Sequence, residues 1–124
     1  MTRISAPTRG KSAQMFFVAL ALEYGWNPQL TLNEDLPFDV VIQKPGEPYA
    51  EVQVKRMFPR KGRSAPYVDM KKQGQGYEAD DADYLAAVDM ERGRFYLIPW
   101  EEVYEVKRKA IQHDQFAQYC HALC

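Results

Sequence analysis

The sequence predicts an α/β fold in which a central mixed β-sheet is flanked by α-helices. An apolar segment at residues 13–24 ends at Gly25, which is typical of a buried helix with a glycine C-cap. Runs of β-branched and aromatic residues follow, separated by Gly- and Pro-containing turns, and these are typical of strands. A length of 124 residues suits one domain spanning residues 1–124.

The N-terminal region divides into an arm and a helix. We expect residues 1–10 to be a flexible arm, because Pro7 and Gly10 interrupt a stretch without hydrophobic periodicity. Ser12 is suited to cap the following helix, since its hydroxyl can accept a backbone N–H. Apolar residues lie around nearly the whole circumference of this helix, which predicts that it packs across a sheet and beneath other elements.

Five strands are expected, at residues 27–32, 38–43, 50–58, 84–88 and 94–100. Pro45 and Gly46 lie between the second and the third and predict a hairpin. The span 59–83 is polar and rich in glycine, and a long polar loop in a small domain is often functional. The tail after residue 100 has a weak helical pattern.

Composition excludes several classes of protein. No apolar run reaches transmembrane length, and the first residues lack the apolar centre of a signal peptide. Cys120 and Cys124, four residues apart in an expected helix, form neither a disulfide framework nor a zinc spacing. We therefore expect no membrane partner and a cytoplasmic location, which would be the host cytoplasm for a viral protein.

Polar residues interrupt the two strands of the expected hairpin. Glu51, Gln53 and Lys55 alternate with valines, so they share one face of their strand. Antiparallel pairing brings Asp39 of the preceding strand close to the Gln53–Lys55 end. Taken singly, Asp39 is also typical of a turn and Lys55 of a strand end, but core strands rarely carry such a set without a function.

These side chains suit metal-assisted attack of water on a phosphodiester. Asp39 and the Gln53 carbonyl offer the oxygen ligands that Mg²⁺ or Mn²⁺ prefers. The Lys55 ammonium can hold the attacking water and offset charge that develops on the phosphoryl oxygens.

The stretch "FDVVI … AEVQVKR" resembles the PD-(D/E)XK nuclease superfamily, whose fold is restriction-endonuclease-like. Asp39 matches the Asp of the motif, Gln53 stands at its Asp/Glu position and Lys55 matches its Lys. The order of helix, hairpin, "YEADDADYLAAV" and "RFYLIP" is similar to a branch with a Gln-x-Lys centre, which includes some intron-encoded homing endonucleases and phage proteins. The resemblance covers roughly residues 11–100 and implies a divalent-metal-dependent endodeoxyribonuclease that acts on DNA.

The chain departs from this pattern at two positions. Gln53 removes one negative charge from the metal site, and Gln14 stands where relatives often place a Glu in the first helix. Gln14 is therefore assigned a supporting role. Glu51, on the face of Gln53 and Lys55, is the nearest candidate for a replacement metal ligand, and Glu23 is a weaker one.

A basic stretch directly follows Lys55, where phosphates would have to lie. Such a stretch is commonly a solvated loop, but its position favours contact with DNA. The candidate DNA-binding residues are Arg56, Arg60, Lys61 and Arg63, with Lys71 and Lys72 further along the chain.

Assembly and subtype stay open at this point. One site per chain predicts a homodimer or a higher even homo-oligomer if both strands of a duplex are cut. Apolar residues around Phe116, Tyr119 and Leu123 could form that interface or complete the core. The nuclease could be of the homing type, a junction resolvase or a repair enzyme. The alternatives outside this class are a catalytically decayed nucleic-acid-binding module on the same fold and, more distantly, a viral protein-interaction factor.

Overall fold

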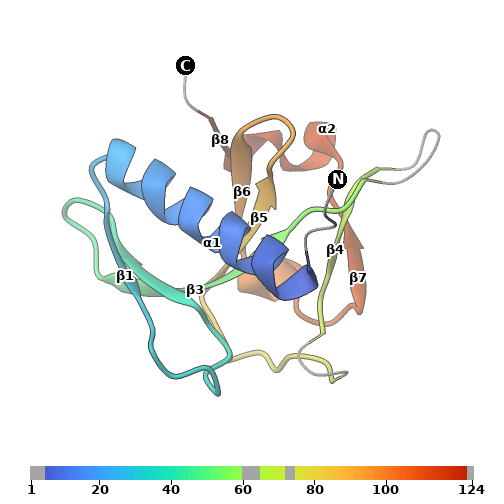
Figure 1. Ribbon diagram of the computed structural model, residues 1–124, viewed down its shortest axis with the longest axis horizontal. Helices are drawn as coiled ribbons and strands as arrows, with labels where there is room; N and C mark the ends of the chain where they lie inside the picture. Colours follow the sequence, from blue (N-terminus) through green and yellow to red (C-terminus); the bar gives the residue numbers. More distant parts are fainter. Residues whose placement is uncertain (1–4, 60–64, 72–74, 123–124) are drawn as a thin grey trace.

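A curled six-stranded mixed sheet forms the centre of the molecule (Figure 1). The computed structural model describes residues 5–59, 65–71 and 75–122. Strand order across the sheet is β1-β2-β3-β5-β6-β8; β3 and β5 are parallel, and the other neighbours are antiparallel. The strands span Asn27–Leu30 (β1), Val40–Gln43 (β2), Tyr49–Arg56 (β3), Tyr84–Asp89 (β5), Arg94–Pro99 (β6) and Cys120–Ala122 (β8). The mixed sheet predicted from the sequence is thereby confirmed.

The predicted hairpin joins β2 to β3. Gly46 has a φ of 76° in its turn, a conformation that side-chain-bearing residues rarely adopt. Val40 pairs with Val52, and the Asp39 N–H donates to the Val52 carbonyl at 2.9 Å. This register places Asp39 across from Gln53, as the hairpin pattern predicted.

The first helix, α1 (Ala6–Glu23), begins earlier than expected. Ser5 is its N-cap and accepts the Thr8 N–H at 3.4 Å, while Pro7 lies in the first turn, where a missing N–H has no cost. The expectation of a flexible arm is therefore wrong for residues 6–10, and Ser12 lies inside the helix rather than at its cap. At the other end Gly25, with φ of 79°, follows the C-cap as predicted.

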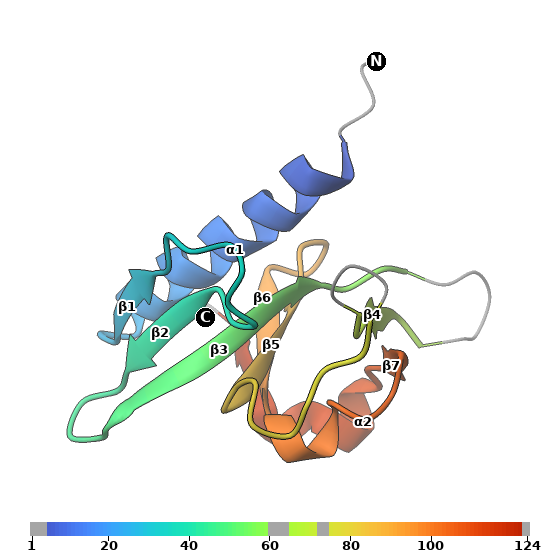
Figure 2. The same cartoon turned by 90° about the horizontal axis from the view of Figure 1, so that it is seen from below.

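Helix α1 covers one face of the sheet (Figure 2). Ala13, Phe17 and Leu20 are buried against it, and Phe17 meets Phe95 edge-on at a centroid distance of 4.9 Å. The opposite side faces solvent, with Met15 46% and Leu22 60% exposed, so the helix does not lie beneath other elements. Helix α1 has more apolar residues than positions that face the sheet, so some apolar side chains lie in solvent.

The other face of the sheet carries a second core and a two-stranded ribbon. The ribbon pairs β4 (Tyr67–Asp69) with β7 (Arg108–Ala110), antiparallel. Short helical segments complete this layer: η1 (Trp100–Glu102), α2 (His113–Phe116) and η2 (Ala117–Tyr119). The predicted helical tail is thus wrong over most of its length, because its residues pair with β4 and with the edge of β6.

The tail completes the core. Phe116 is buried, and Tyr119 packs against the core while its hydroxyl donates to Glu102 Oε2 at 2.6 Å. Phe116 is therefore not available for a subunit interface, and Leu123 lies outside the described residues. Cys120 belongs to strand β8 instead of a helix. None of the described helices is long and apolar enough to cross a membrane.

The stability of the fold is expected to depend on the protonation of His121. Its ring stacks on Phe95 at 5.0 Å, and burial lowers the pKa of His121 below its ordinary value of 6.5. Below that pH the unfolded chain binds more protons than the folded protein, so the His121 contribution is complete above pH 6.5 and is lost as the pH falls. Urea unfolding at a series of pH values should show a steeper loss of stability toward acid in the wild type than in His121→Phe, which keeps the stacked ring. Parallel pH profiles for the two proteins would contradict this expectation.

Candidate active site

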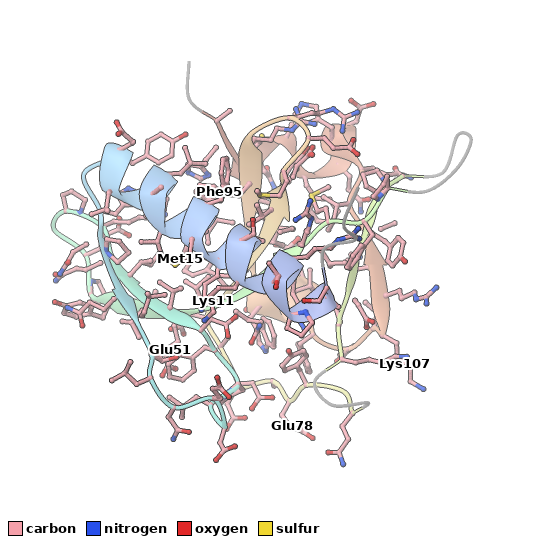
Figure 3. The ribbon with its side chains drawn as sticks, in the orientation of Figure 1. Lys11, Met15, Glu51, Glu78, Phe95 and Lys107 are labelled. Atoms are coloured by element: carbon pink, nitrogen blue, oxygen red, sulfur yellow. The ribbon has the colours of Figure 1, made fainter. Side chains whose placement is uncertain are left out.

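A cleft of about 450 Å³ opens beside the end of β3. The N-terminal half of α1, the loop before β2 and the end of β4 form its other walls, and Figure 3 labels Lys11 on the helix wall. The charged and amide side chains that line the cleft are Lys11, Gln14, Asn33, Glu34, Asp39, Gln53, Lys55, Arg56, Asp69 and Lys71. The structure therefore brings together all of the predicted catalytic residues.

Asp39 and Gln53 are in direct contact. Gln53 Nε2 donates to Asp39 Oδ2 at 2.7 Å and to the Val54 carbonyl at 3.2 Å. Both partners are acceptors, which fixes the NH₂ group on this side and leaves the amide oxygen, Oε1, as the remaining polar atom of Gln53. The Val54 N–H also donates to Asp39 Oδ2, at 3.0 Å. The carboxylate of Asp39 is thus fixed by two hydrogen bonds at one oxygen.

Lys55 reaches from β3 toward β4. Its Nζ donates to the Lys71 carbonyl at 3.0 Å and lies 5.4 Å from the centroid of the Tyr77 ring. Because Lys55 and Gln53 are two residues apart on one strand, their side chains point to the same face. The ammonium group is therefore positioned in the cleft that also contains the Asp39–Gln53 pair.

Tyr77 lies beneath this group and is buried. Burial is the main cause that raises the pKa of its hydroxyl, and the negative charges of Asp39, Asp81 and Asp69 raise it further. The ring packs edge-on against Trp100 at 5.1 Å. Tyr77 thus belongs to the core.

The structure describes only some of the candidate supporting and DNA-binding residues. Gln14 is buried on the sheet-facing side of α1 and lines the cleft, and Arg56 and Lys71 line it too. Both cations are half-buried. Four other predicted DNA contacts lie outside the described residues: Arg60, Lys61, Arg63 and Lys72.

Glu51 does not join this group. It lies on β3, where Figure 3 labels it, and it does not line the cleft. Its backbone N–H donates to Asp83 Oδ2 at 2.7 Å. Across the described ranges, no three His, Cys, Asp or Glu side chains are grouped so that they could hold a metal without other ligand types.

Lys11, Glu34 and Asp69 line the cleft but were not expected from the sequence. A signal for Asp69 exists in the segment "YVDMKK", where Val68 and Met70 are fully buried and alternate with Asp69. This period of two indicates a strand whose other face points away from the core. Lys11 and Glu34 have no comparable signal, because their positions depend on the tertiary packing of α1 and of a loop.

The chemistry of this donor set fits a hard divalent cation next to a phosphate. Asp39 supplies a carboxylate and Gln53 an amide oxygen, which are ligand types that Mg²⁺ and Mn²⁺ accept. Lys55, Arg56 and Lys71 supply positive charge along the same cleft. The cleft thus contains ligand types that suit a divalent cation and positive charges that suit an anionic substrate.

Known structures contain this fold. No protein-family model and no curated protein matches the sequence. Among solved structures, the chain is similar to a bacterial homing endonuclease, I-Ssp6803I, with a TM-score of 0.74 and 24% sequence identity. The alignment covers 88% of this chain and 76% of that chain. The chain thus shares the mixed α/β fold of that endonuclease.

Proposed function

We propose that this protein is a divalent-metal-dependent endodeoxyribonuclease of the PD-(D/E)XK superfamily, in its Gln-x-Lys branch, with a restriction-endonuclease-like fold. The observation that carries the proposal is the convergence of Asp39, Gln53 and Lys55 in one cleft, with the Asp39–Gln53 contact at 2.7 Å. The fold shared with a homing endonuclease supports it.

Asp39 and Gln53 would hold Mg²⁺ or Mn²⁺, which when bound supplies positive charge that polarises the scissile phosphate. The hydrogen bonds from Gln53 and Val54 keep the Asp39 carboxylate in place without metal. Glu51, outside the cleft, is not part of the ligand set that we propose.

Lys55 would act on water and phosphate. Its ammonium donates a hydrogen bond to the attacking water and offsets the negative charge that grows on the phosphoryl oxygens. The Lys71 carbonyl keeps Nζ in position until the substrate arrives. Arg56 and Lys71 would bind neighbouring phosphates of the DNA backbone, with the basic residues of the following segment extending the contact.

Cutting both strands needs two such sites, so the working form would be a homodimer or a higher even oligomer. A homing-type enzyme and a junction resolvase both meet this requirement, and substrate preference separates them.

A second candidate is a nucleic-acid-binding module with a decayed catalytic centre. Gln14 and Gln53, both in the cleft at positions where related nucleases carry acids, favour it. Such a module would bind DNA with an affinity that falls steeply with salt, and it would need no metal ion.

One experiment separates the two candidates. The purified protein is incubated with supercoiled plasmid, linear duplex, single-stranded DNA and a four-way junction, each with Mg²⁺, Mn²⁺ or EDTA. We expect cleavage with either metal and none with EDTA, and the preferred substrate indicates the subtype. Intact DNA in every reaction, together with a shifted band in a gel, would favour the binding module.

A further inference from the structure

The proposed metal site is short of negative charge. Gln53 and Gln14 stand where relatives carry acids, so Asp39 is the one carboxylate at the motif positions. A site for Mg²⁺ or Mn²⁺ usually contains more than one carboxylate, since each anionic ligand increases affinity. Among the described lining residues, the cleft contains two further acids, Asp69 and Glu34.

Asp69 lies at the end of β4 with one carboxylate oxygen enclosed. Oδ1 of Asp69 is buried and has no hydrogen-bond partner in the part of the chain that the structure describes. A buried polar atom without a partner has a desolvation cost of about 1–3 kcal/mol, and most such atoms in folded proteins are satisfied. Its retention here points to a partner that binds later.

No cation of the protein neutralises Asp69 within the described ranges. Arg108 lies directly across the ribbon from it, but the guanidinium stacks over the Tyr67 ring at 5.1 Å. The two ion pairs among the described residues both involve Asp89 as the acid, and neither involves Asp69. The local structure thus leaves the Asp69 carboxylate without an ion pair although a cation lies opposite.

Asp69 lies near the catalytic group. The side chains of Asp39 and Asp69 line the same cleft, and the negative charges of both raise the pKa of the buried Tyr77 hydroxyl. Lys55 Nζ donates to the carbonyl of Lys71, two residues beyond Asp69, which attaches the end of β4 to β3. Asp69 therefore lines the same cleft as the Asp39–Gln53 pair.

We propose that Asp69 binds the same divalent cation as Asp39 and Gln53 and supplies the carboxylate that the motif lacks. This inference rests on the proposed function. Glu34, the other acid of the cleft, is exposed on the loop before β2 and has no buried oxygen that lacks a hydrogen-bond partner. Asp69, on a strand, is therefore the better candidate for a metal ligand in a fixed position.

A calorimetric titration of the intact protein with Mn²⁺ measures the affinity for the metal and tests the assignment. Asp69→Asn is compared with the wild type. Glu34→Gln tests the alternative that Glu34 is the metal ligand, and Asp114→Asn is the matched control. Asp114 is exposed at the start of α2 and does not line the cleft. The metal-free melting temperature and the Mn²⁺ concentration for half-maximal plasmid cleavage are measured on the same proteins.

We expect Asp69→Asn to weaken Mn²⁺ binding about tenfold or more and to raise the half-saturating Mn²⁺ concentration accordingly. Its metal-free melting temperature should equal or exceed that of the wild type, because the substitution removes the negative charge from a side chain whose Oδ1 atom is buried without a hydrogen-bond partner. Asp114→Asn should match the wild type in all three measurements.

Four results would overturn the assignment. Wild-type Mn²⁺ affinity in Asp69→Asn would exclude Asp69 as a ligand while the proposed function stood, and a loss confined to Glu34→Gln would transfer the role to Glu34. A lower metal-free melting temperature in Asp69→Asn would show that Asp69 is structural. Failure of the wild type to bind Mn²⁺ or to cut DNA would reject the proposed function itself, and the inference with it.

Discussion

Replacement of Lys55 by alanine is expected to lower the single-turnover rate of DNA cleavage by about two to three orders of magnitude. The ammonium is held in the cleft by the Lys71 carbonyl at 3.0 Å, so it is already in place before the substrate binds. An alanine side chain neither orients a water nor offsets charge on a phosphoryl oxygen. Cleavage is measured at saturating Mg²⁺ with enzyme in excess over a labelled duplex.

Two further variants show whether the loss comes from position or from charge alone. Lys55→Arg keeps the charge but has a planar, wider head group, so only a small part of the activity should return. Lys107→Ala removes an exposed lysine outside the cleft, labelled in Figure 3, and should leave the rate unchanged. If Lys55→Ala cuts at nearly the wild-type rate but binds DNA more weakly, Lys55 contacts a phosphate of the DNA and does not take part in the reaction.

The centre of the site could be predicted from the sequence because it is local. A Pro-Gly turn fixes the hairpin, and the turn length then fixes which residues of β2 and β3 pair. Once Val40 pairs with Val52, the positions of Asp39 and Gln53 follow, and the period of two places Lys55 on the same face.

The rest of the site depends on contacts between distant segments. β4 and β7 are three residues each and are about forty residues apart in the sequence, so their pairing has little local signal. The alternation around Asp69 indicates a short strand, but the place of that strand beside the cleft depends on its pairing with β7 and could not be predicted. The tail was misread for the same reason: β8 is a short strand that is stabilised where it covers the edge of β6.

The start of α1 shows a different limit. Pro7 and Gly10 favour a flexible arm in the sequence, yet proline is well suited to the first turn of a helix, and Ser5 supplies the cap. The earlier start matters for function, because it adds to the cleft a helical wall that includes Lys11. A helix that began at residue 13 would leave that side open.

Asp39→Asn is expected to reduce cleavage by about three orders of magnitude or more and to weaken Mn²⁺ binding, while the fold is kept. The carbonyl oxygen of asparagine can still accept the two hydrogen bonds from Gln53 Nε2 and the Val54 N–H. The substitution therefore removes the charge and leaves the local geometry in place.

Asp39→Ala provides the contrast. It leaves the buried Val54 N–H without its acceptor, so we expect an additional loss of about 1–3 kcal/mol in the free energy of unfolding. If Asp39 acts through the metal, both variants are inactive but only the alanine variant is less stable in urea. If Asp39→Asn still cuts DNA in Mg²⁺, the carboxylate is structural, and the metal must be held elsewhere in the cleft. The comparison of the two variants thus separates the role of Asp39 in fixing the hairpin from its role in the reaction.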